Sequence, residues 1–345
     1  MTGNTTGSVT RATAVRDRDA ACTRIGFLLI PDFSMMALIS ALEPLRSANY
    51  VAGRPIYDWT LITPDGRPAR ANSGIEMTPV KSIAEFDFHP FVLVCASIDG
   101  QWFDDRATFA WLRSLDRHGA RIGAISTGSY PLARAGLLDG YRCTIHWEFL
   151  TSFTEDFPEL EVTGRLFEID GSRVTAAGGS ATFDLMLHLI AEEHGHDLAA
   201  AVAEQLIHPM PDEPDAPQRL PLTQRLRISH PKLITIIEMM EKNLEEPLSR
   251  ERLAMQVDLS TRQVERLFTK YLGKSPARYY LELRLKRAHL LLCQTSLPIL
   301  DVSVACGFVS ASHFSKSYRD FFGHSPRHER APRAARAPTP DAVGP

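Results

Sequence analysis

Short apolar runs alternate with amphipathic stretches over residues 24–196. Four runs are apolar along their length and too short for buried helices, so we expect strands at Ile25–Ile30, Trp59–Ile62, Phe91–Cys95 and Arg121–Ile125. Longer stretches with helical spacing lie between and after them, at Ser34–Asn49, Arg106–His118 and Ala181–His194. Apolar strands separated by helices are typical of a parallel sheet covered on both faces. This part of the chain is therefore predicted to be an α/β domain.

Beyond residue 220 the pattern predicts only helices, about seven short ones. Within Leu253–Leu272, a short helix is followed by a turn and by a second helix, which begins with a capping box of Ser260 and Gln263. The apolar stripe of this second helix is predicted to be buried and consists of Val264, Leu267, Phe268 and Tyr271. This arrangement is that of a helix-turn-helix.

The same pattern returns about 50 residues later in the chain. Ile299–Gly307 is the expected first helix, and Ser310 caps a second helix with the apolar stripe Phe314, Tyr318, Phe321 and Phe322. One long helix, Ala277–Gln294, is expected between the two units. Such a helix can hold the two second helices about 34 Å apart, so that both enter successive major grooves of DNA.

The faces opposite the two apolar stripes carry mostly polar side chains and are predicted to contact DNA. The predicted DNA-binding residues are Arg262, Glu265, Arg266, Thr269, Ala311, Ser312, Ser315 and Lys316. Residues 219–330 hold 19 Lys and Arg against 11 Asp and Glu, whereas the rest of the chain holds 19 against 30. A basic module on an acidic body favours nucleic-acid binding. The alternative is a helical bundle whose charges are only solvated.

A proline-rich segment separates the two parts of the chain. Five prolines fall among the 14 residues from His208 to Pro221, and such a segment is extended and cannot continue a helix. The predicted organisation is a disordered leader at 1–22, the α/β domain at 23–207, a linker at 208–228, the helical domain at 229–330 and a disordered tail at 331–345.

Composition narrows the cellular context. The five cysteines are scattered without a Cys-x-x-Cys pair, which indicates free thiols in a reducing cytoplasm and no zinc motif. The N-terminal residues lack the apolar core of a secretory signal, and no apolar run approaches the about 20 residues of a membrane span. We expect a cytoplasmic protein with no cofactor, no metal and no membrane partner.

The stretch GAISTGS at 123–129 is a candidate for chemistry. The strand that ends at Ile125 runs directly into Ser126, and a helical run follows. A sharp strand-to-helix turn lifts one side chain above the sheet and is typical of a nucleophile elbow, and open α/β sheets bind ligands at this end of their strands. A serine needs a base to act as a nucleophile. The candidate base is His146, with Glu43 orienting it or competing with it.

Residues 230–330 resemble the DNA-binding domain of the AraC/XylS family. The motifs that carry the resemblance are Leu253-Ala254, Arg262–Phe268, GKSP at 273–276, Arg284-Leu285 with Ala288, CGF at 306–308, SHF at 312–314 and FFGHSP at 321–326. The resemblance implies that both second helices contact base edges, that the partner is double-stranded promoter DNA, and that the protein is an activator.

Residues 24–196 resemble the ThiJ/PfpI superfamily, a class I glutamine-amidotransferase-like group with a flavodoxin-like sheet. The segment from Ser126 to Trp147 carries this resemblance, and Glu43 matches an acid near the elbow in that superfamily. The domain order is similar to the GlxA-type transcription regulators. The segment LDGYRCTIHWE at 138–148 is similar to the corresponding segment in regulators of carnitine, glycine betaine and arginine catabolism. The resemblance implies a homodimeric sensor of a small nitrogenous metabolite, an amino acid or a quaternary amine.

The elbow departs from the hydrolases of that superfamily. Many relatives place Cys where this chain has Ser126, and the PfpI-type hydrolases place His where it has Thr127. Three interpretations stay open: a working catalytic triad, an elbow kept for ligand sensing, and a purely structural turn. The absence of these hydrolase residues favours ligand sensing. The predicted ligand-binding residues are Glu43, Ser126, Thr127, His146 and Trp147. The alternative function is an amidase or other hydrolase that uses Ser126, with an ancillary helical domain.

Overall fold

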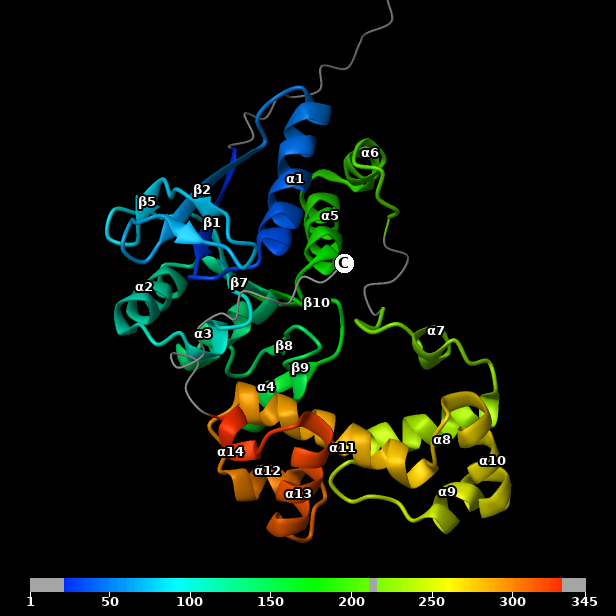
Figure 1. The fold of residues 1–345 in the computed structure, drawn as a ribbon. Helices are drawn as coiled ribbons and strands as arrows, with labels where there is room; N and C mark the ends of the chain where they lie inside the picture. Colours follow the sequence, from blue (N-terminus) through cyan, green and yellow to red (C-terminus); the bar gives the residue numbers. More distant parts are fainter. Residues whose placement is uncertain (1–21, 211–215, 331–345) are drawn as a thin grey trace, which may run out of the picture.

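The computed structural model describes residues 22–210 and 216–330, which form an α/β domain and a helical domain (Figure 1). The predicted leader, apart from Cys22, and the predicted tail lie outside the described residues, as do residues 211–215 of the linker. Within the described part, no helix is both long and apolar enough to cross a membrane.

Seven strands form the main sheet of the α/β domain. Across the sheet they are β10 (Phe167–Asp170), β11 (Arg173–Ala176), β7 (Arg121–Ile125), β6 (Phe91–Cys95), β1 (Thr23–Leu29), β2 (Tyr57–Thr63) and β5 (Lys81–Ser82). Within this sheet only β10 and β11 pair antiparallel. Numbered along the chain, β2, β1, β6, β7 and β11 follow the flavodoxin-like order 2-1-3-4-5. The predicted fold class is confirmed.

Helices cover both faces of this sheet because successive strand residues point to opposite sides. Phe27 and Leu29 of β1 pack in one core with α1 (Met35–Ala52), α5 (Ser180–His194) and α6 (His196–Gln205). Leu28 packs on the other face with α2 (Arg106–Arg117), α3 (Ser129–Arg134) and α4 (Leu150–Asp156). Two short pairs lie outside the main sheet, β3 (Ala69–Arg70) with β4 (Glu76–Met77) and β8 (Arg142–Thr144) with β9 (Glu161–Thr163).

Each predicted strand is present with its ends shifted by at most two residues, but β5, β10 and β11 of the main sheet were missed. For β11, the reason lies in its polar residues. Arg173 is only 3% exposed, pairs with Asp116 at 2.8 Å and donates to the carbonyl of Leu137. A buried ion pair of this kind is made by residues distant in the chain, so hydrophobic spacing cannot reveal the strand.

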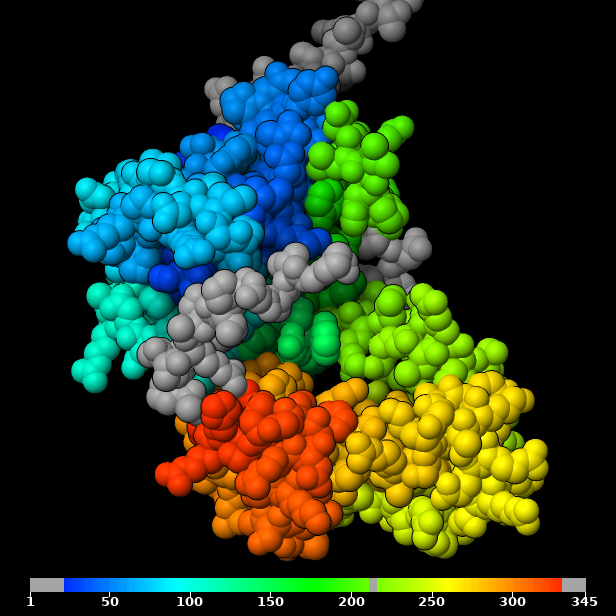
Figure 2. Space-filling model, in the orientation of Figure 1, coloured from blue at the N-terminus to red at the C-terminus, as the bar shows by residue number. Residues whose placement is uncertain are grey.

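Seven helices form the described part of the helical domain at 229–330. They are α8 (Pro231–Lys242), α9 (Arg250–Gln256), α10 (Thr261–Leu272), α11 (Pro276–Gln294), α12 (Ile299–Ala305), α13 (Ala311–Phe322) and α14 (Pro326–Glu329). The long helix α11 belongs to two cores: its first turns pack with α8, α9 and α10, and its later turns pack with α12 and α13. Figure 2 shows the two halves, yellow and orange-red, side by side below the α/β domain.

The two halves also meet at Gly307, which follows α12. Its φ of 71° lies in the left-handed region, and a Cβ atom there would be 2.7 Å from the carbonyl oxygens of both Leu244 and Glu245 in the loop after α8. Arg284 of α11 donates to the carbonyls of Cys306 (2.8 Å) and Gly307 (2.6 Å). Arg284 therefore bonds the free carbonyls at the end of α12, and Gly307 packs closely against the first half of the helical domain.

One expectation needs correction. Tyr271 was predicted to be buried on α10, but it is 39% exposed, and its ring contacts His230 and the Lys270 ammonium near the surface. A short helix, α7 (Leu222–Leu226), directly follows the proline-rich segment, and its Leu222 packs into the first core of the helical domain.

Candidate functional sites

The first helix-turn-helix consists of α9 and α10. Ser249 caps α9, and the predicted capping box of Ser260 and Gln263 is present at the start of α10. Asp258 adopts a φ of 51° in the turn, and Lys232 of α8 donates to its carbonyl at 3.0 Å. The turn is thus held by the neighbouring helix, which fixes the direction in which α10 leaves it.

The outer face of α10 is open to solvent. Arg262, Arg266 and Thr269 are exposed, whereas Glu265 is half-buried and its carboxylate lies 3.7 Å from the guanidinium of Arg250. The guanidinium of Arg250 therefore lies beside Glu265, the one acidic residue among the predicted DNA contacts. His230, Lys232 and Lys270 line the same surface and were not among the predicted residues, because the first two lie outside α10, at the start of α8.

The second helix-turn-helix consists of α12 and α13. Ser310 caps α13, and the side chains of Phe314 and Tyr318 on the inner face of α13 are buried. Three of the predicted contacts, Ala311, Ser312 and Lys316, are exposed, and Ser315 is half-buried. Val309, in the turn before α13, is fully exposed.

The elbow follows β7 as expected from the sequence. Ser126 has a φ of 62° and begins a single 3-10 turn that ends at Gly128. A Cβ atom at Gly178 would lie 2.8 Å from Cβ of Ser126, and one at Gly128 would collide with the carbonyl of Val94. Positive φ is costly for a residue with a side chain, so close backbone packing on both sides is what holds Ser126 in this strained conformation.

The hydroxyls at the elbow are engaged differently. Thr127 is buried and its Oγ1 donates to the carbonyl of Ser97. Ser126 is 8% exposed, and among the described residues no hydrogen bond joins its hydroxyl to a partner. In particular, no described hydrogen bond connects it with His146, the candidate base, so a nucleophilic pair is not assembled in this structure.

His146 lies in the loop after β8 and is half-buried. Burial lowers the pKa of His146 below its ordinary value, and the nearby Glu148 opposes this shift in part. Its Nδ1 accepts a hydrogen bond from the backbone of Glu148 at 3.4 Å. The imidazole is therefore neutral near pH 7 and suited to hydrogen bonding, with Nε2 carrying the proton.

The other two predicted ligand residues have partners of their own. The carboxylate of Glu43, on α1, pairs with Arg46 at 2.8 Å and is partly exposed. The ring of Trp147 is covered by the guanidinium of Arg219 at 4.8 Å. Arg219 belongs to the linker, which is fastened beside this loop by the amide of Gln218, a donor to the carbonyls of Ile145 and Arg165.

A direct contact joins the two domains. The hydroxyl of Ser152 on α4 donates to Oε1 of Gln294 at 2.6 Å, and Glu155 pairs with Arg287 at 3.5 Å. Next to this contact lies a cavity of about 850 Å³, to which Trp102 and Glu148 contribute from the α/β domain. Glu148, which directly follows Trp147 in this loop, therefore lines the cavity at the junction of the two domains.

Comparison with known proteins agrees with this architecture. Residues 23–192 match the DJ-1/PfpI family, and residues 253–331 match a family described as a helix-turn-helix domain. The HTH-type transcriptional regulator GbdR of Pseudomonas aeruginosa is 48% identical over 306 residues, 89% of this chain and 83% of GbdR. The HTH-type transcriptional regulator GlxA of Rhizobium meliloti is 40% identical over 304 residues, 88% of this chain and 94% of GlxA.

An enzyme is among the more distant relatives. Isonitrile hydratase of Pseudomonas putida is 28% identical over 184 residues, which cover 53% of this chain and 77% of the hydratase. This match is weaker and shorter than those to GbdR and GlxA.

Fold, exposed helices and relatives together define a two-domain DNA-binding transcriptional regulator. The chain belongs to the AraC-type regulators that join a DJ-1/PfpI domain to a C-terminal pair of helix-turn-helices. The resemblances to the AraC/XylS family and to the GlxA-type regulators are confirmed.

Proposed function

We propose that this regulator binds promoter DNA through the outer faces of α10 and α13, and that a small nitrogenous metabolite bound at the elbow controls transcription. One observation carries the DNA-binding part: both helices are capped, exposed and joined by the single helix α11. With 19 residues, α11 is about 28 Å long at 1.5 Å per residue, close to the roughly 34 Å between successive major grooves. Activation is the outcome that the family resemblance favours.

The chemistry of the predicted ligand residues indicates the class of effector. A ring that already accepts the guanidinium of Arg219 is able to accept another cation in its place. Ser126 and His146 add neutral hydrogen-bonding groups. The Thr127 hydroxyl and the Glu43 carboxylate, which bond Ser97 and Arg46, would exchange these partners for the ligand. This combination supports an amino acid or a quaternary amine as the ligand, bound without a further cofactor.

The linker offers a route from the ligand to the DNA-binding domain. Gln218 and Arg219 are held against the loop that carries His146 and Trp147, and α7 follows in the first core of the helical domain. A cation that displaces Arg219 from Trp147 would loosen this attachment. The position of α10 would then depend on whether the ligand is bound.

We expect Ser126→Ala to weaken effector binding without changing DNA binding in the absence of effector. Loss of one hydrogen bond costs about 0.5–1.5 kcal/mol. The effector is found first by a thermal-shift screen of amino acids, betaines and polyamines, in which a ligand at 100 times its dissociation constant adds about 2.7 kcal/mol of stability. Calorimetric titration then compares the variant with wild type and with Ser73→Ala, a change in an exposed turn.

The second candidate function is hydrolysis at Ser126. The strained elbow and the distant hydratase relative favour it, whereas the unpaired geometry of Ser126 and His146 does not. Turnover of the identified effector by purified wild-type protein decides between the two. Hydrolysis that disappears in Ser126→Ala would show that the α/β domain is an enzyme.

We also propose that the protein is a homodimer in the cytoplasm, where it meets DNA. Support comes from α1, on which Met36, Ile39 and Tyr50 are all more than 40% exposed. Met36 and Ile39 lie about one turn apart on one face of the helix, and Tyr50 lies on the same face beyond the Glu43–Arg46 ion pair. Exposed apolar side chains that share a helix face are typical of an interaction surface.

Ile39→Asp is expected to convert the dimer into a monomer, because an unpaired charge would have to be buried in the interface. Sedimentation or light scattering at micromolar concentration measures the mass. Val80→Asp, at another exposed apolar residue, should leave the mass unchanged. An Ile39→Asp protein that still sediments as a dimer would place the interface elsewhere.

A further inference from the structure

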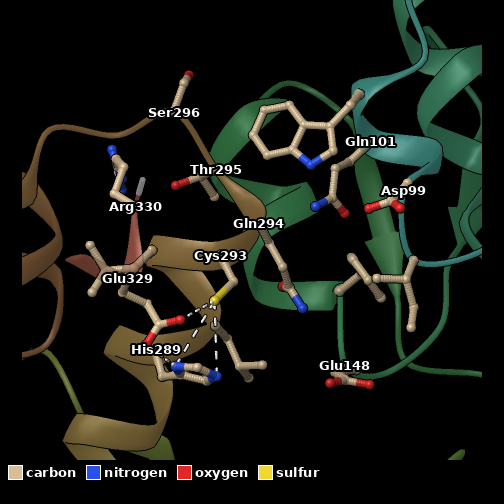
Figure 3. Close-up of a pocket in the computed structure, with 15 residues that line it drawn as sticks. Asp99, Gln101, Glu148, His289, Cys293, Gln294, Thr295, Ser296, Glu329 and Arg330 are labelled. Atoms are coloured by element: carbon tan, nitrogen blue, oxygen red, sulfur yellow. Dashed lines mark hydrogen bonds and ion pairs between the residues drawn. The ribbon is translucent and has the colours of Figure 1, made fainter. Parts of the chain in front are cut away.

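Three potential metal ligands of the helical domain lie close together on the side that faces the α/β domain (Figure 3). His289 and Cys293 lie four residues apart on α11, so their side chains share one helix face. Glu329, the last residue of α14, points toward both and is only 6% exposed. A thiol, an imidazole and a carboxylate thus meet at one point.

The distances are close to those of a coordination sphere. Cys293 Sγ lies 3.6 Å from Oε1 of Glu329 and 3.9 Å from each ring nitrogen of His289. Nδ1 of His289 and Oε2 of Glu329, 3.3 Å apart, both contact the Tyr318 hydroxyl, so Nε2 and Oε1 are the atoms left for an ion. Around a tetrahedral zinc ion with bonds of about 2.0–2.3 Å, neighbouring ligand atoms are about 3.3–3.8 Å apart. The three ligand atoms lie within 4.8 Å of one another, so side-chain rotations would bring them to these separations.

Neighbouring side chains orient the ligands. The Tyr318 hydroxyl donates to Oε2 of Glu329 at 3.1 Å, and Nε2 of His324 approaches the same oxygen at 3.1 Å. Nδ1 of His289 lies 3.1 Å from the Tyr318 hydroxyl. Metal sites depend on outer groups of this kind to fix ligand geometry.

An ion can reach the cluster from the cavity between the domains. His289, Cys293 and Glu329 line the cavity of about 850 Å³, and Glu148 and Trp102 line it from the α/β domain. The cavity side leaves room for a fourth ligand, either water or a donor from a small molecule.

We propose that His289, Cys293 and Glu329 bind one divalent transition-metal ion, for which Zn²⁺ has the best-matched chemistry. Zinc takes sulfur, imidazole and carboxylate ligands in tetrahedral geometry, whereas Mg²⁺ and Ca²⁺ require oxygen ligands. Binding converts the Cys293 thiol to a thiolate, and its proton passes to solvent. No redox change occurs.

The ion would join α11 to α14 beside the contact between the domains. Gln294 directly follows Cys293 and accepts the hydrogen bond from Ser152 of α4. Occupancy of the site would therefore stabilise the second half of the helical domain and the junction together.

Titration of the chelator-treated full-length protein with Co²⁺ tests the proposal. We expect one ion per chain, the visible bands of tetrahedral Co²⁺ and a near-ultraviolet thiolate-to-cobalt charge-transfer band, all removed by added Zn²⁺. Cys293→Ser should abolish the charge-transfer band and weaken Zn²⁺ binding at least about tenfold. Cys22→Ser, at the other partly accessible cysteine, should bind like wild type.

His289→Gln provides a second variant, because its partly exposed side chain tolerates replacement better than buried Glu329. It should weaken Zn²⁺ binding but keep the far-ultraviolet circular dichroism of wild type. Co²⁺ binding without a thiolate band, or equal Zn²⁺ affinity in wild type, Cys293→Ser and His289→Gln, would overturn the proposal.

Discussion

Replacing Arg266 by alanine is expected to remove most of the specific affinity for the operator while leaving the protein folded. The side chain is exposed on the outer face of α10, so no core contact is lost. A guanidinium that makes two hydrogen bonds to one base contributes about 1–3 kcal/mol of discrimination. At 1.4 kcal/mol per factor of ten, the dissociation constant should rise roughly 5- to 150-fold, with relaxed preference at one base pair.

Fluorescence anisotropy at fixed salt, with specific and scrambled duplexes, measures this effect. Arg67→Ala is the matched control, because it removes the same charge from an exposed loop of the α/β domain. It should leave both affinities nearly unchanged. Lys316→Ala on α13 should act like Arg266→Ala but more mildly, since a lysine offers a less defined contact. An Arg266→Ala protein with unaltered affinity and preference would show that α10 does not read the DNA.

The second large effect is expected from Gly307→Ala. The residue has positive φ, which costs about 1–3 kcal/mol for a side-chain-bearing residue. The new Cβ would also lie 2.7 Å from two carbonyl oxygens of the loop after α8, and overpacking typically costs about 1–3 kcal/mol more. A loss of roughly 2–6 kcal/mol is a large share of a domain's stability of about 5–15 kcal/mol.

Gly323→Ala separates the two causes. Gly323 also has a positive φ, 82°, but a Cβ there would meet nothing within 4 Å. Urea unfolding, followed by circular dichroism of the helices, should show a much smaller loss for Gly323→Ala than for Gly307→Ala. Equal losses would mean that the loop after α8 accommodates the added methyl group at no measurable cost.

The sequence determined the features that depend on neighbouring residues. Apolar runs located β1, β2, β6 and β7, because most of the side chains that these strands bury are apolar and adjacent in sequence. Capping residues and helical spacing located α10 and α13, because these signals act within one or two turns. The elbow was visible for the same reason: a strand that runs into Ser126 is a local pattern. The charge contrast between residues 219–330 and the rest pointed to the DNA-binding domain.

Tertiary structure decided what depends on residues far apart in the chain. It buried Arg173 against Asp116, placed Arg219 on Trp147 and exposed Tyr271. It also brought Glu329 to His289 and Cys293, although no spacing in the sequence resembles a metal motif. Such contacts are fixed by the packing of whole elements, and a side chain's own neighbours in sequence carry no information about its partner across the fold. Local patterns therefore identified the elements and the class of protein, whereas packing alone set the partners of the site residues.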